Sequence, residues 1–349
     1  MRWLVGTYGD SIAVLDLDIA TGRLTAVAAY SCPANPSFLA LHPHLPVIYA
    51  VHELSIWNGG FGGAASAYTI GADGPLDLLG THPTHGTDPC HLAVDPSGRW
   101  LVVANYSSGH ITSLPIDPDG ALGPAAEVLA HRGSSVDPAR QAGPHPHHVA
   151  VMNERLLVYD LGMDLILPYR LDAAGHFIAD CPPLVTLSGG GPRRIVFHSV
   201  LPCGYVLNEL QASLTRFAAG ADGLLQPRET VPMLPTDYAG RRSGAEVQVA
   251  PSGRFVYASN RGHDSIACFA VDPTNGALTP RGHTPSGGAE PRHFAISPCG
   301  AFLLAANQRS DRVVLFRLDR QTGAMAETDQ SVTVQKPVCL LPIPEETHR

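Results

Sequence analysis

Residues that could carry out acid–base chemistry on an anionic substrate recur at corresponding places along this chain. The candidates for catalysis are His145, His147, Arg193, Glu209 and Arg261. A histidine can take a proton from water at neutral pH, a carboxylate can orient it, and arginines can hold an anion or a developing oxyanion. No serine lies in a Gly-x-Ser-x-Gly segment, so a covalent serine mechanism has no support in the sequence.

A second set of polar residues follows the same placement. Each stands at the start of one apolar segment or at the end of the next, and we expect the set to bind substrate: His91, Asp160, Glu246, Arg292 and Gln308. Charged residues make up only 15% of the chain. Their repeated occurrence at two kinds of position therefore indicates a polar pocket.

The histidine cluster in Gly143-Pro-His-Pro-His-His-Val149 also has a spacing that suits metal ligands. No carboxylate or cysteine nearby completes a ligand set, which favours a base over a ligand. The seven cysteines never form a Cys-x-x-Cys pair, so buried reduced thiols are favoured over a disulfide frame or a zinc site. We expect no metal and no other cofactor.

The elements that position these residues form an internal repeat. Each unit contains short apolar segments, rich in β-branched and aromatic residues, separated by Pro and Gly turns, a pattern typical of β-strands. Units start at Pro36, Pro89, Pro146, Pro192, Gly244, Pro291 and Pro337, with spacings of 46 to 57 residues. Seven starts in 349 residues predict an all-β, seven-bladed β-propeller with four strands in each blade.

The two ends of the chain supply complementary parts of one blade. Val338 to Leu341 provide a single strand after the last start, whereas the N-terminus has three strands, at residues 3–8, 12–18 and 24–30, and no first strand of its own. We expect the C-terminal strand to complete the N-terminal blade and close the ring, because closure removes exposed sheet edges. One domain, residues 1–349, is predicted.

In a propeller, the start of each first strand and the turn between the second and third strands lie at the same mouth of the channel. The candidates therefore converge, although Glu209 and Arg261 could instead form an ion pair that braces adjacent blades. Because side chains alternate along a strand, we expect His148 to pack away from His147, and one of Arg193 and Arg194 to face a neighbouring blade. The Pro-Ser-Gly turns lie on the opposite face and should be structural.

Composition sets the remaining limits. The formal net charge of −8 gives no general attraction to nucleic acid or to anionic lipid. No window is long and apolar enough for a membrane span, and the chain starts directly in a strand. We expect a cytoplasmic protein with a small-molecule substrate and neither nucleic acid nor membrane as a partner. The sequence leaves the oligomeric state open.

Four further motifs are Pro-His-Pro-His-His, Asn-Glu-Leu, Pro-Arg-His-Phe and Ser-Asn-Arg-Gly-His-Asp-Ser-Ile at residues 259–266. With them the chain resembles, over essentially its whole length, the lactonase family of seven-bladed propellers. That family contains bacterial 6-phosphogluconolactonase and fungal carboxy-cis,cis-muconate cyclase. The resemblance implies an active centre at His147 or its neighbours, Arg193, Glu209 and Arg261. The position after Gly-Pro-Arg, often histidine in relatives, is Arg194 here.

The resemblance implies metal-independent hydrolysis of a sugar-acid lactone, 6-phosphogluconolactone first, by histidine-assisted attack of water with arginines holding the anion. Two alternatives stay open. The protein could be a lactonase or cyclase for another lactone, such as an unphosphorylated aldonolactone or a carboxymuconate, or a non-catalytic propeller that binds a protein partner. A scaffold would not need histidine, glutamate and three arginines around a narrow channel.

Overall fold

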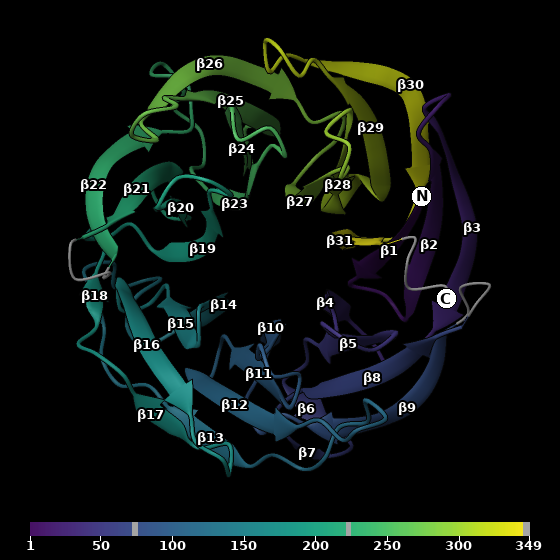
Figure 1. Ribbon diagram of the computed structural model, residues 1–349, viewed down its shortest axis with the longest axis vertical. Helices are drawn as coiled ribbons and strands as arrows, with labels where there is room; N and C mark the ends of the chain where they lie inside the picture. The colour runs from purple at the N-terminus through teal and green to yellow at the C-terminus, as the bar shows by residue number, and fades with distance from the viewer. Residues whose placement is uncertain (72–75, 221–224, 345–349) are drawn as a thin grey trace.

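The computed structural model describes residues 1–71, 76–220 and 225–344. These residues form seven antiparallel blades in a ring around a channel (Figure 1). In each blade the first strand lies at the channel and the fourth at the rim. The predicted all-β, seven-bladed propeller is confirmed.

The strands of blades 1 to 4 have the following bounds. Blade 1 contains β31 (Pro337–Ile343), β1 (Arg2–Thr7), β2 (Ser11–Asp18) and β3 (Arg23–Ser31). Blade 2 contains β4 (Pro36–Leu41), β5 (Val47–His52), β8 (Ala64–Ile70) and β9 (Leu76–Pro83), with a hairpin of β6 (Ile56–Trp57) and β7 (Gly60–Phe61). Blade 3 contains β10 (Pro89–Val94), β11 (Trp100–Asn105), β12 (His110–Pro115) and β13 (Glu127–Ala130). Blade 4 contains β14 (Pro146–Met152), β15 (Arg155–Asp160), β16 (Leu165–Leu171), β17 (Phe177–Ala179) and β18 (Leu184–Val185).

Blades 5 to 7 repeat the same four-stranded arrangement. Blade 5 contains β19 (Pro192–Phe197), β20 (Cys203–Asn208), β21 (Ser213–Ala219) and β22 (Leu225–Pro232). Blade 6 contains β23 (Gly244–Val249), β24 (Phe255–Asn260), β25 (Ser265–Val271) and β26 (Leu278–Pro285). Blade 7 contains β27 (Pro291–Ile296), β28 (Phe302–Asn307), β29 (Arg312–Leu318) and β30 (Met325–Thr333). The only helical element among the described residues is the 3₁₀ turn Gln308–Ser310. The described part of the chain therefore contains no helix long enough to span a membrane.

The ring closes as the sequence predicts. Strand β31 pairs antiparallel with β1, so that Trp3 lies opposite Pro342 and Leu4 opposite Leu341. The first and last described strands therefore lie side by side in one blade, at the right of Figure 1. Closure pairs the inner edge of the N-terminal sheet, which would otherwise present unpaired backbone groups to solvent.

The hydrophobic core lies between neighbouring blades. Trp3 and Leu15 of blade 1 pack in one buried cluster with Phe302 and Leu304 of blade 7. Corresponding clusters join the other neighbours. Each fully buried large apolar side chain contributes roughly 1.5–3 kcal/mol by leaving water. The first strands are thus held by packed blades on both sides, which gives the channel a rigid wall.

The turns on the face opposite the predicted site connect blades, as expected. Gly98 ends a Pro-Ser-Gly turn with φ of +72°, a conformation that favours glycine, and a Cβ there would lie 2.8 Å from the His42 ring. His42 Nε2 hydrogen-bonds the Gly98 carbonyl at 3.0 Å. His198, which follows β19, makes the same contact with the Gly253 carbonyl of blade 6 at 2.9 Å, so it also links neighbouring blades.

Candidate active site

The first strand of each blade has a β-bulge close to its start, and the bulge decides which side chains face the channel. In β14, Pro146 lies opposite Asp160 and His148 opposite Tyr159, so His147 is an extra residue in the ladder. Two residues on the bulged strand then oppose one on its partner. As a result, His147 and His148 both line the channel.

The same bulge occurs in β19, where Pro192 lies opposite Asn208 and Arg194 opposite Leu207. Arg193 and Arg194 therefore both line the channel. The predicted alternation of direction within this pair, and within the histidine pair of β14, was wrong because it assumed a regular ladder.

Two cavities of the channel share part of their lining, including His147 and Arg292. The wider has a volume of about 200 Å³, and the narrower, of about 20 Å³, has room for roughly one water molecule. The outer layer consists of the residues that line the wider cavity, together with Arg193, which lines the narrower cavity but contacts Glu209 directly: Tyr8, Glu53, Cys90, Tyr106, Arg140, His147, Arg193, Glu209, Arg261 and Arg292. The inner layer consists of the remaining residues that line the narrower cavity: Ser37, Phe38, His91, His148, Arg194, Glu246, His293 and Val338.

Glu209 is the centre of the outer layer. It follows β20, and Arg193 Nε lies 3.0 Å and Arg261 Nη2 2.8 Å from its Oε2 atom. Arg140 Nη2 lies 2.7 Å from its Oε1 atom. Burial alone would raise the pKa of Glu209, but these guanidinium groups hold the pKa well below its ordinary value. The carboxylate is therefore ionised, and the alternative ion pair between Glu209 and Arg261 is present.

Arg193 and Arg261 are also fixed by backbone carbonyls of blade 6. Arg193 Nη1 donates to the Ala245 carbonyl, and Arg261 Nη2 donates to the Gly244 carbonyl at 2.9 Å. Burial and the neighbouring Arg261 lower the pKa of Arg193 to about 10. Both arginines remain charged at neutral pH and are held in place before any ligand arrives.

His147 lies beside this ion cluster as a neutral base. Burial, together with the charge of Arg193, lowers its pKa well below the ordinary value. Among the described residues, no hydrogen bond involves the His147 imidazole, whose ring lies 5.6 Å from the Tyr106 ring. A ring nitrogen is therefore free to accept a proton.

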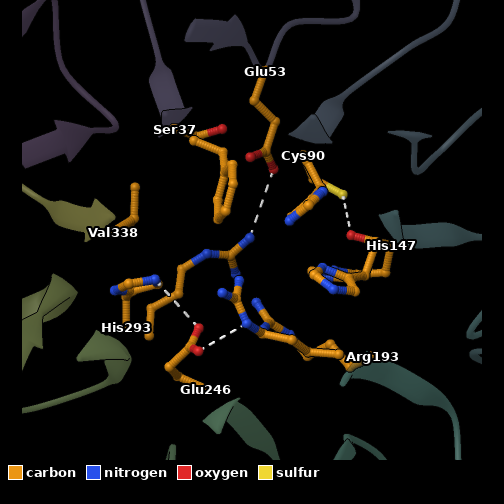
Figure 2. A pocket seen from close by; sticks show the side chains of 13 residues that line it. Ser37, Glu53, Cys90, His147, Arg193, Glu246, His293 and Val338 are labelled. Carbon is orange, nitrogen blue, oxygen red and sulfur yellow. Dashed lines mark hydrogen bonds and ion pairs between the residues drawn. The ribbon is translucent and has the colours of Figure 1, made fainter. Parts of the chain in front are cut away.

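Arg292 is the least paired cation of the outer layer. Its Nη2 atom lies 3.8 Å from Glu53 Oε1 (Figure 2), and its guanidinium carbon lies 5.2 Å from the centre of the Tyr8 ring. No described residue accepts a hydrogen bond from it. Arg292 can therefore bind an anion without first giving up a strong partner.

The inner layer has a different arrangement of charge. Arg194 Nε lies 2.8 Å from Glu246 Oε1, and His293 Nε2 lies 3.3 Å from Glu246 Oε2 (Figure 2). The backbone N–H of Leu340 donates to His293 Nδ1 at 3.2 Å, so Nε2 carries the proton that points to Glu246. Burial outweighs Arg194 and raises the pKa of Glu246 to about 7.

The structure does not bring all the sequence candidates to the cavities. His91 and Glu246 lie in the inner layer, and His145 stacks on Tyr106 outside both linings, with ring centres 4.6 Å apart. Asp160 is buried away from the channel, where His131 Nδ1 lies 2.7 Å from its Oδ2 atom. Gln308 starts the 3₁₀ turn and lines neither cavity.

Arg140 is a site residue that the sequence analysis missed. It lies in residues 131–145, between β13 and β14, and not at a strand start or a second turn. Tyr8 was also missed, because it stands at the end of β1 in the blade that has no N-terminal first strand. The only sequence signal for Arg140 is its position five residues before His145.

No metal centre is evident from the donor groups. Within residues 1–71, 76–220 and 225–344, no three His, Cys, Asp or Glu side chains are arranged to hold a metal ion. All seven cysteines are free thiols. The chemistry that these side chains can supply is proton transfer by His147 and anion binding by arginines.

Comparison with known proteins identifies the family. A sequence model described as lactonase, 7-bladed beta-propeller, matches residues 2–342. The chain belongs to this lactonase family. A 6-phosphogluconolactonase from Formosa agariphila is 33% identical over 296 residues, which is 82% of this chain and 82% of that protein. A 6-phosphogluconolactonase from Bacillus subtilis is 30% identical over 84% of both chains.

A solved structure shows how closely the lactonase fold is kept. The periplasmic gluconolactonase of Pseudomonas aeruginosa superposes with a TM-score of 0.90 and 33% identity, over 98% of this chain and 99% of that one. The family resemblance inferred from the motifs is therefore confirmed over nearly the whole chain.

Proposed function

We propose that the outer layer hydrolyses a sugar-acid lactone that carries an anionic group, with 6-phosphogluconolactone as the substrate, and that it does so without a metal. The observation that carries this proposal is the contact of ionised Glu209 with three arginines next to the neutral, unpaired His147. The cavity of about 200 Å³ is smaller than the roughly 300–1,000 Å³ of sites for drug-sized ligands, which suits a small metabolite.

The geometry supports a general-base mechanism. His147 takes a proton from a water molecule as the water oxygen attacks the lactone carbonyl, and the carbonyl oxygen becomes an oxyanion. Arg193 and Arg261, already fixed by Glu209 and by backbone carbonyls, donate to that oxyanion. When the ring carbon–oxygen bond breaks, the protonated His147 returns its proton to the leaving alkoxide, and the open-chain acid forms.

Charge favours an anionic substrate. Four arginines face two glutamates in the outer layer, so the cavity keeps an excess of positive charge in a chain whose net charge is −8. Arg292 has no strong partner there. A cavity lined by one sign of charge concentrates ligands of the opposite sign. This excess supports a phosphate on the substrate.

The names of relatives support the same class of substrate and one alternative. Two relatives are 6-phosphogluconolactonases, and the similar solved structure is a gluconolactonase. An unphosphorylated aldonolactone is therefore the second candidate. Cyclisation, the reverse chemistry, would use the same base and anion-binding groups.

A panel of lactones tests the proposal. We would follow acid release with a pH indicator for 6-phosphogluconolactone, gluconolactone and a muconolactone, and subtract spontaneous hydrolysis. We expect the phosphorylated lactone to have the highest kcat/KM, by roughly 100-fold, since charge-assisted contacts to phosphate are worth roughly 1.5–3 kcal/mol each. No enzymatic rate on any lactone would leave a binding scaffold as the better account.

We also propose a cytoplasmic location. The support is the set of seven free cysteines, three of them buried, because structural thiols without disulfides are usual in reducing compartments. The Pseudomonas aeruginosa relative is named periplasmic, so location is not carried over from that protein. Cell fractionation with an antibody to the chain would decide it, and recovery in an extracytoplasmic fraction would overturn it.

A further inference from the structure

The segment of residues 131–145 is clamped at both ends by one carboxylate. His131 Nδ1 lies 2.7 Å from Asp160 Oδ2, and the backbone N–H of His145 donates to Asp160 Oδ1 at 2.7 Å. His131 and Asp160 are both buried. A buried, fully hydrogen-bonded group of this kind fixes the backbone it joins. Asp160 therefore serves this segment and does not face the channel.

The middle of the segment is fixed as well. Gln141 is fully buried, and its Nε2 atom donates to Asp164 Oδ1 at 2.8 Å and to the Leu161 carbonyl at 2.9 Å. Ser135 Oγ donates to the other Asp164 oxygen, Oδ2, at 2.6 Å. Arg140 directly precedes this anchored glutamine, so the backbone presents its side chain to the cavity in a defined place.

Arg140 is the outermost of the three arginines around Glu209. Its side chain is 44% exposed, compared with 6% for Arg193 and 8% for Arg261. Only its Nη2 atom is engaged, by Tyr106 Oη at 3.1 Å and by Glu209 Oε1 at 2.7 Å. The Nε and Nη1 atoms make no hydrogen bond with any described residue. Arg140 thus keeps unused N–H donors where a ligand enters from solvent.

Arg292 lines the same cavity and is similarly under-used. Arginine presents its N–H groups as a planar fork that matches the oxygens of a phosphate. We infer that Arg140 and Arg292, which line the same cavity, together form the subsite for the phosphate of the substrate. This inference rests on the proposed lactonase function and gives the two partly free arginines a role separate from that of Arg193 and Arg261.

The alternative is that Arg140 only braces Glu209. In that case its removal would weaken catalysis on every lactone to the same degree, because Glu209 is used whatever the substrate carries. A phosphate subsite instead predicts a loss that is larger for the phosphorylated substrate. Comparing two substrates in one variant therefore distinguishes the two roles.

The chain provides a matched control in Arg241. It lies in residues 233–243, between β22 and β23, and its Nη2 atom lies 2.6 Å from Glu290 Oε2. Its side chain is 52% exposed, much like Arg140, but it lines neither cavity of the channel. Replacing it removes one exposed arginine and one ion pair without changing the proposed subsite.

The experiment measures kcat and KM for 6-phosphogluconolactone and gluconolactone in the wild type, Arg140→Ala, Arg140→Lys and Arg241→Ala. We expect Arg140→Ala to lower kcat/KM for the phosphorylated lactone by roughly 10- to 100-fold more than for gluconolactone, chiefly through KM. Arg140→Lys should fall between, since lysine keeps the charge but loses the fork. Arg241→Ala should stay within roughly twofold of the wild type for both lactones.

Equal losses on both lactones in Arg140→Ala, or the same discrimination in Arg241→Ala, would overturn the inference. A calorimetric titration with 6-phosphogluconate keeps the two proposals separate. If the wild type hydrolyses neither lactone, the proposed function fails. The subsite still stands if 6-phosphogluconate binds the wild type and binds Arg140→Ala at least roughly tenfold more weakly, and it falls if the affinities match or the wild type does not bind. Circular dichroism of each variant checks that the fold is kept.

Discussion

The outer and inner layers of the channel both take side chains from the bulged strands β14, β19 and β27, yet the pKa values of their carboxylates are shifted in opposite directions. Glu209 of the outer layer contacts three guanidinium groups, which overcome the effect of burial and keep its pKa well below the ordinary value. Glu246 of the inner layer contacts one guanidinium, of Arg194, and burial raises its pKa to about 7. The number of cations around each carboxylate therefore decides the direction in which its pKa is shifted.

Because of this difference, the two layers are suited to different functions. An ionised carboxylate with several arginines and an accessible cavity of about 200 Å³ can take part in chemistry on an anionic substrate. The inner layer encloses about 20 Å³, too little for a sugar, and two of its histidines, His91 and His293, accept hydrogen bonds from the backbone of neighbouring strands. Polar residues in a channel are thus not all site residues, and the layer in which each one lies is the useful distinction.

The largest expected difference between the layers is in two adjacent histidines. His147→Ala should lower kcat by roughly two to four orders of magnitude, because it removes the proton acceptor. His148→Ala, one residue further along the same strand, should lower kcat by less than roughly tenfold. Steady-state kinetics on 6-phosphogluconolactone, with circular dichroism to check folding, measures both. Equal losses in the two variants would remove the functional distinction between the layers.

The pH dependence of the wild type gives a second comparison. Burial and Arg193 lower the pKa of His147, so the imidazole stays unprotonated as the pH falls through roughly 6.5, the ordinary value for histidine. We expect kcat/KM to decline only at a more acidic pH. A pH profile with its acid limb at or above pH 7 would show that His147 is not the base.

Stability should reveal the raised pKa of Glu246. Its pKa of about 7 in the folded protein is above the ordinary value of 4.5, so the folded state binds the proton more tightly than the unfolded state. Protonated Glu246 contributes on the order of 3 kcal/mol to the free energy of unfolding below pH 4.5. This contribution is lost as the pH rises through 7. Glu246→Gln cannot ionise, so its free energy of unfolding should improve relative to wild type between pH 5 and pH 8.

Urea unfolding at those two pH values measures the change. The comparison uses the difference between pH values within each protein, so a constant cost of the substitution cancels. Parallel pH dependence in the wild type and Glu246→Gln would mean that Glu246 is ionised throughout and that Arg194 outweighs burial.

Chelation should have the smallest effect. We expect lactone hydrolysis to be unchanged after dialysis against EDTA, since the outer-layer imidazole of His147 acts as a base in the proposed mechanism. Loss of activity that a divalent ion restores would indicate that His145 and His147 are metal ligands. His147 would then not be the base that distinguishes the outer layer from the inner layer.

The sequence predicted the fold in detail for a physical reason. Every first strand begins at the proline or glycine that was predicted as its start. Proline is suited to this position because a strand that starts with proline loses no ladder hydrogen bond there. The β-bulge near the start of each first strand could not be predicted from the sequence in the same way. It is a shift of register between two strands, so the pattern of apolar residues in one strand does not contain it.

The candidate site was predictable only where it depends on blade geometry. Glu209 and Arg261 lie at second turns, and His147 and Arg193 at first-strand starts, so the repeat itself brings them together. Arg140 depends instead on tertiary contacts of Asp160 and Asp164 with residues 131–145. Nothing in the local sequence marks those contacts.

The central claim is that Glu209, and not Glu246, organises lactone hydrolysis, and kcat/KM for 6-phosphogluconolactone in Glu209→Gln and Glu246→Gln tests it most directly. Because Glu209→Gln leaves three arginines without their carboxylate, Glu209→Asp is measured beside it as a variant that keeps the charge but shortens the side chain. We predict a loss of roughly 1,000-fold in Glu209→Gln, a smaller loss in Glu209→Asp and less than roughly tenfold in Glu246→Gln. A folded Glu209→Gln protein with near wild-type activity, or a greater loss in Glu246→Gln, would contradict the account.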